Sequence, residues 1–152
     1  MPTLPEVSQY NFSFSNISME WLLATAALAM ILSLALAWVA TLIIYGQVHA
    51  IRKIFPATQN LIRAHIDYLM MATLLIAFYF ACIHLGIALP AAVIAILCFG
   101  VLYNPFGFIL KAINPKTGQS DTLAGKILVC SGFLPATIGF GYASFAILAT
   151  LI

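Results

Sequence analysis

The side chains that could perform chemistry lie in two short clusters within an otherwise apolar sequence. They are Arg63, His65, Asp67 and Tyr68 in the first cluster, and Tyr103, Asn104 and Lys111 in the second. Neutral imidazole is a common ligand of haem iron and transition metals. Because the sequence has no HExxH motif and no His/Cys cluster for a closed metal site, two interpretations of His65 stay open. It is either a single axial haem ligand or a polar residue satisfied within the protein.

Helical spacing predicts which residues of these clusters lie on the same face of a helix. Residues His65, Tyr68 and Ala72 share one helix face, and positions 104, 107 and 111 share another. At about 1.5 Å per residue, both clusters lie within roughly 10 Å of one membrane boundary. A proline at position 105 removes the N–H that would bond the Val101 carbonyl, and freed backbone carbonyls are tolerated in a membrane where they line a cavity. We therefore expect a polar pocket near that boundary.

Each polar residue also has a plainer interpretation. Asp67 could pair with Lys111 or Arg63, since a buried charge requires a partner. Tyr103 could belong to an interfacial aromatic belt. The other two histidines are expected to be solvated near the inner surface (His49) and interfacial near the outer helix end (His84), with His49 as an alternative or second haem ligand.

The amino-acid composition indicates that this chain folds in lipid rather than in water. Of 152 residues, 64% are hydrophobic and 7% are charged, and the mean hydropathy is +1.10. Soluble domains are about 45–50% apolar and about 25% charged, so a soluble enzyme, a secreted disulfide scaffold and a nucleic-acid binder are excluded. A net charge of +2 is too small to indicate a polyanionic partner. The three cysteines, Cys82, Cys98 and Cys130, lie in apolar stretches and are interpreted as buried small hydrophobes.

Four apolar runs are long enough to cross a bilayer as helices, which takes about 20 residues each. They are Trp21 to Tyr45, about Asn60 to Leu89, about Ala91 to Leu110, and about Ile127 to Ile152. The second is stopped by Pro90, and the turn between Gly86 and Ala91 must be very short, so the second and third are expected to form a tight antiparallel hairpin. The sequence therefore predicts an all-α, integral membrane four-helix bundle over residues 21–152, preceded by an outer N-terminal cap over residues 1–20.

The basic residues predict the orientation of these helices. All six lie in the first–second and third–fourth connections or at the adjoining helix ends: Arg52, Lys53, Arg63, Lys111, Lys116 and Lys126. By the positive-inside rule these connections face the cytoplasm. Both termini are therefore expected outside.

Several short segments resemble the styrene oxide isomerase family, which is related to the hydroxylaminobenzene mutases. They cover roughly the last 90 residues in order: Arg63-Ala-His65, Met70-Met71, Asn104, Gly107-Phe108, Asn114-Pro115-Lys-Thr-Gly118 and Pro135-Ala-Thr-Ile-Gly139. Two positions differ from the family pattern, because Met71 and Ile109 stand where the family has Asn and Tyr.

The resemblance implies a function and a cofactor. It implies a bacterial inner-membrane homotrimer that binds haem b between subunits, with His65 as the axial ligand. The haem iron would act as a Lewis acid that rearranges a small apolar epoxide to a carbonyl compound. We expect Tyr68, Tyr103 and Asn104 to position or polarise the substrate, and Asp67 to hold the site or a cationic intermediate. The alternative is a non-catalytic subunit that anchors or braces a larger membrane complex.

Overall fold

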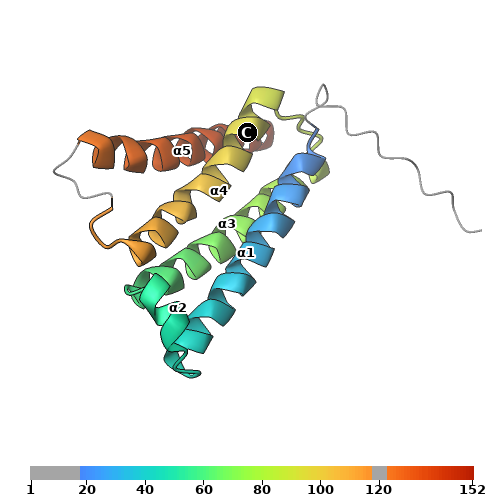
Figure 1. Ribbon diagram of the computed structural model, residues 1–152. Helices are drawn as coiled ribbons and strands as arrows, with labels where there is room; N and C mark the ends of the chain where they lie inside the picture. The colour runs from blue at the N-terminus through green and yellow to red at the C-terminus, as the bar shows by residue number, and fades with distance from the viewer. Residues whose placement is uncertain (1–17, 118–122) are drawn as a thin grey trace, which may run out of the picture.

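The protein is all-α, as predicted, in a computed structural model that describes residues 18–117 and 123–152. Its helices are α1 (Glu20–Ile44), α2 (His49–Ile54), α3 (Thr58–His84), α4 (Ala91–Ile113) and α5 (Leu123–Leu151) (Figure 1). Nearly all of the predicted N-terminal cap lies outside the described residues.

Four of these helices, α1, α3, α4 and α5, are long and apolar enough to span a membrane. Their bounds agree with the predicted spans to within a few residues; the larger differences are that α3 ends at His84 rather than about Leu89 and that α5 begins at Leu123 rather than about Ile127. The short helix α2 was not predicted, because six residues carry too little hydrophobic pattern to be recognised. Large apolar side chains such as Trp38 and Phe145 are exposed. Such outward apolar faces suit a multi-pass membrane protein surrounded by lipid.

The spanning helices form a row in the order α1, α3, α4, α5 (Figure 1). Helix α3 packs along α1 on one side and against α4 on the other, and α1 also touches α4. Helix α5 packs almost entirely on α4, with a minor contact to α3. As a result, α4 is the only link of any extent between α5 and the remaining described helices.

Small residues allow α4 and α5 to approach closely. A Cβ placed on Gly100 would lie 2.7 Å from the Cα of Ala136, which means that the two backbones touch at this point. One turn further along α5, a Cβ on Gly139 would lie 2.7 Å from the Leu97 side chain. This is the small-residue packing by which membrane helices gain van der Waals contact without a hydrophobic driving force.

The connection between α3 and α4 is the tight hairpin that the sequence predicted. Gly86 adopts a left-handed backbone conformation with φ +68°, which glycine accommodates without strain. The Ile87 N–H donates to the Cys82 carbonyl at 2.8 Å, which closes the end of α3. Pro90 then precedes the first residue of α4.

The start of α3 and the end of α4 are joined at the ends of these helices that lie opposite the hairpin. The Ala57 N–H donates to the Ala112 carbonyl at 3.2 Å, and Asn60 Nδ2 donates to the Lys111 carbonyl at 3.3 Å. These bonds satisfy carbonyls that the last turn of a helix leaves unpaired. We call this the basic end, because α2, the first turns of α3 and the last turn of α4 place Arg52, Lys53, Arg63 and Lys111 here. Which side of the membrane it faces stays a prediction.

Candidate functional site

His65 lies in the second turn of α3 and bonds to α1 through one ring nitrogen. Its Nδ1 lies 2.8 Å from the Ser33 hydroxyl oxygen and 3.0 Å from the Ser33 backbone carbonyl oxygen. The same hydroxyl donates to the His65 carbonyl at 2.9 Å. Ser33 is fully buried, so this contact lies at the centre of the α1–α3 packing.

These contacts determine which nitrogen carries the imidazole proton. A backbone carbonyl only accepts hydrogen bonds, and the Ser33 hydroxyl proton is directed to the His65 carbonyl. Nδ1 must therefore be the N–H donor toward Ser33. In the neutral ring, Nε2 then keeps its lone pair and is free to bind a ligand. Second-neighbour bonds of this kind commonly orient a metal-ligating histidine.

Nε2 of His65 has no partner among the residues that the structure describes. It also reaches the surface of the chain, since no buried side-chain nitrogen or oxygen in those residues lacks a hydrogen bond. Helical spacing places Ile62, Ile66 and Leu69 on the same face of α3, and all three are exposed. An accessible imidazole nitrogen thus lies within an apolar strip.

Tyr68 lies one turn further along α3 and points toward α4. Its side chain is 2% exposed, and its hydroxyl donates to the Leu102 carbonyl at 2.8 Å. The acceptor is the carbonyl one residue after that of Val101, whose helical partner Pro105 removes.

Asp67 and Asn104 connect the same two helices. Asn104 Nδ2 donates to Asp67 Oδ2 at 3.2 Å. The ion pair considered from the sequence, between Asp67 and Lys111 or Arg63, is not formed by the described residues. An amide replaces the cation because Asn104 faces α3 at the level of Asp67, whereas the Arg63 guanidinium contacts Asn60.

Asn104 also borders a small cavity between α4 and α5, of about 110 Å³. Its polar lining consists of Tyr103, Asn104 and Lys111, with Gly107 and Gly132 in its walls. The prediction that positions 104, 107 and 111 share one helix face is confirmed, because all three line this cavity.

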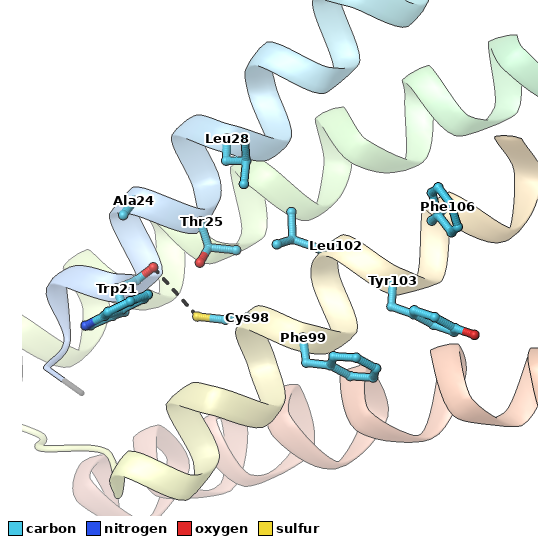
Figure 2. A pocket seen from close by; sticks show the side chains of 9 residues that line it. All are labelled: Trp21, Ala24, Thr25, Leu28, Cys98, Phe99, Leu102, Tyr103 and Phe106. Atoms are coloured by element: carbon cyan, nitrogen blue, oxygen red, sulfur yellow. Dashed lines mark hydrogen bonds between the residues drawn. The ribbon is translucent and has the colours of Figure 1, made fainter. Parts of the chain in front are cut away.

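A larger, almost wholly apolar cavity of about 410 Å³ lies between α1 and α4 (Figure 2). Three aromatic rings follow one face of α4 along it: Phe99 and Tyr103 stack with centroids 5.1 Å apart, and Phe106 follows at 6.5 Å from Tyr103. At the far end, the Cys98 thiol donates to the Trp21 carbonyl at 3.6 Å. Tyr103 borders both cavities.

The predicted site residues therefore lie at similar levels along the helices, but they face different neighbouring helices. His65 faces α1, Asp67 and Tyr68 face α4, and Tyr103 and Asn104 line the cavity between α4 and α5. Neither cavity described above is lined by His65. The single polar pocket expected from the sequence is thus divided among three helix contacts, because residues 65 and 67 lie on nearly opposite sides of α3.

The remaining candidates are peripheral to these contacts. His49 in α2 and His84 at the end of α3 are both exposed. Met71 and Ile109, which differ from the family pattern, are partly buried against the core. Cys82 is buried and Cys98 half-buried, but Cys130 is exposed on α5, so the prediction of a buried Cys130 is wrong. Helix α5 packs almost entirely on α4, which leaves that position uncovered.

Sequence analysis missed Ser33, the residue that orients His65. The available signal was a serine hydroxyl at the centre of a 25-residue apolar helix. Such a residue often bonds to its own helix, as Thr41 does to the Ala37 carbonyl. Only the α1–α3 packing distinguishes the two cases.

Comparison with known proteins leaves the site to be interpreted from its geometry, because no family model, curated protein or solved structure matches this chain.

Proposed function

We propose that the protein is a haem b-binding isomerase of the bacterial inner membrane, with His65 as the axial ligand. One observation carries the proposal. The Nδ1–H of His65 is held by the Ser33 carbonyl at 3.0 Å, while Nε2 is unpartnered and accessible. This arrangement provides a neutral nitrogen ligand of fixed orientation.

The surroundings of His65 also fit a large, flat and mostly apolar group. The strip formed by Ile62, Ile66 and Leu69 offers exposed apolar surface beside Nε2, and Ser33 restrains rotation of the ring. Among the described residues, no three His, Cys, Asp or Glu side chains gather as a metal cluster. A single imidazole is sufficient for haem, whose other iron ligands come mainly from the porphyrin.

When bound, haem would supply a Lewis-acidic iron that polarises an epoxide oxygen and favours rearrangement to a carbonyl compound without net oxidation or reduction. The chain would bind and orient the iron through His65 and Ser33. The apolar cavity along Phe99 and Tyr103 would hold a small apolar substrate away from water, and since His65 of the same chain does not line it, a second copy would have to bring the iron to it. Assignment of Tyr68, Tyr103, Asn104 and Asp67 to the reaction stays a prediction.

The site requires more than one copy of the chain. Nε2 of the half-buried His65 reaches the surface of the chain, and the apolar cavity is on the contact between α1 and α4. A second copy that covers the strip beside His65 would enclose the haem on both faces. A homotrimer follows from the family resemblance, as does the orientation with both termini outside.

The proposal predicts a haem spectrum that depends on His65. The wild-type protein, purified in detergent after haem-replete expression, is expected to show a Soret band that His65→Ala abolishes, because iron loses its only protein ligand on this chain. His84→Ala and His49→Ala are matched controls, since both histidines are exposed and away from Ser33. The Soret absorbance of the wild type and the three variants is compared in visible spectra at equal protein concentration.

Three outcomes are informative. A wild-type protein without haem contradicts the proposal. An unchanged Soret band in His65→Ala shows that another residue is the ligand, and loss of the band in His49→Ala would identify it. Conversion of an aryl epoxide to an aldehyde by the haem-loaded protein, absent in His65→Ala, would support the isomerase activity separately from haem binding.

A second candidate function is a non-catalytic subunit that braces a larger membrane complex. It is favoured by the bonds of Tyr68 to Leu102 and of Asn104 to Asp67, in which polar groups satisfy one another between helices. A purified protein that is haem-free but co-purifies with a stoichiometric membrane partner would support this function instead.

A further inference from the structure

We propose that the small cavity between α4 and α5 binds a phosphate group whose molecule also carries hydroxyl donors. Two sources share this chemistry: the headgroup of phosphatidylglycerol in the surrounding bilayer, and free hydrogen phosphate. The proposal is independent of haem, because His65 does not line this cavity.

The cavity has the size and position for such a group. Its volume of about 110 Å³ holds a few non-hydrogen atoms, and it lies toward the basic end of α4 and α5. Space for a ligand exists because a Cβ on Gly107 would meet no atom within 4 Å. On the opposite wall, a Cβ placed on Gly132 of α5 would lie 3.2 Å from the Asn104 Cα, so the missing side chain lets α5 approach closely.

Lys111 supplies a positive charge that the described residues leave without a carboxylate partner. Its ammonium group lies 6.0 Å from the centre of the Phe108 ring and has no other side-chain partner there. The described acidic residues are Glu20, which begins α1 at the end of the helices away from the basic end, and Asp67, which bonds to Asn104. An ammonium group near lipid is stabilised by an anion. Among the residues that the structure describes, the cavity therefore has no negative group to balance the charge of Lys111.

The neutral polar groups refine the ligand class. Because Asn104 donates through Nδ2 to Asp67, its Oδ1 faces α5, at 3.6 Å from where a Cβ of Gly132 would lie. This oxygen accepts hydrogen bonds only. The Tyr103 hydroxyl, which has no partner among the described residues, can donate or accept. A ligand with anionic oxygens for Lys111 and an O–H for Asn104 satisfies all three groups.

The rest of the wall is apolar and includes Phe108, Leu128 and the exposed side chain of Val129. A lipid whose headgroup enters the cavity could lay its glycerol backbone over this surface. Basic pockets between membrane helices at a bilayer boundary are typical sites for anionic lipid headgroups.

The first test measures binding to the intact, delipidated protein in neutral detergent by native mass spectrometry. Phosphatidylglycerol, phosphatidylcholine of matched chains, and inorganic phosphate are titrated separately. Lys111→Gln is expected to weaken phosphatidylglycerol or phosphate binding about fivefold, as loss of one lysine contact implies. Arg52→Gln is the matched control, because Arg52 lies in α2 and outside the cavity.

A second variant tests the cavity without changing charge. Gly107→Leu is expected to fill the space and reduce binding at least as strongly as Lys111→Gln, because a Cβ at this position enters open space. Gly141→Leu in α5 is its control, since a Cβ there also meets no atom within 4 Å. Circular dichroism verifies that all variants keep the wild-type helix content.

The titrations separate the sources and can overturn the proposal. Lys111-dependent binding of phosphatidylglycerol supports the lipid, and Lys111-dependent binding of inorganic phosphate supports the free ion. Equal binding of phosphatidylglycerol and phosphatidylcholine with no phosphate binding overturns it. So does binding that Lys111→Gln and Gly107→Leu leave at the level of their controls.

Discussion

Replacing Gly100 with alanine is expected to lower the free energy of unfolding by about 1–3 kcal/mol, and leucine by more. The added Cβ would lie 2.7 Å from the Cα of Ala136, so the backbones of α4 and α5 must move apart. A side chain can rotate away from such a clash, whereas two helix backbones cannot. Separation of the helices would also loosen the neighbouring contact of Gly139 with Leu97.

The matched control is Gly107→Ala, about two turns from Gly100 in the same helix α4, where a Cβ meets no atom within 4 Å. Unfolding is followed by circular dichroism as SDS is titrated into mixed micelles. If both alanine variants unfold at the same SDS fraction as the wild type, the close approach of α4 and α5 is wrong.

Replacing Tyr68 with alanine is expected to cost about 3 kcal/mol, because it leaves a cavity among α3 and α4 in place of a fully packed ring. Tyr68→Phe keeps the ring and removes only the hydroxyl bond to the Leu102 carbonyl, so its expected cost is about 1 kcal/mol. The difference between the two variants separates the packing of the ring from its hydrogen bond.

The same SDS titration measures both variants, with Tyr142→Phe as the control because Tyr142 is exposed on α5. A Tyr68→Phe protein as stable as the wild type would show that the Leu102 carbonyl finds another donor. A stable Tyr68→Ala protein would contradict the buried position of this ring.

The positions of the helices were predictable from the sequence, but which helices pack against one another was not. Long runs without charge, such as Trp21 to Tyr45, identify spans because an unsatisfied backbone in lipid is too costly for anything but a helix. Proline and glycine at positions 90 and 86 located the hairpin for the same local reason. Whether α4 faces α3, α5 or both depends on packing that no local pattern records.

The candidate site illustrates the same limit. Helical periodicity correctly grouped Asn104, Gly107 and Lys111, because residues of one helix keep a fixed angular relation. It could not reveal that Asn104 bridges Asp67 and the α5 cavity, or that Ser33 holds His65. Those contacts join residues on different helices that are far apart in the sequence, and a single sequence carries no signal for such pairs.

The one-sided attachment of α5 has a consequence for biosynthesis. Helices α1, α3 and α4 contact one another and precede α5 in the chain, so they can assemble while the last helix is still being synthesised. Helix α5 then joins a preformed surface through the glycine contacts of Gly100 and Gly139. Its arrival at the membrane is therefore the step that forms the α4–α5 cavity, and a delay in that step would expose Lys111 and Asn104 to the insertion machinery.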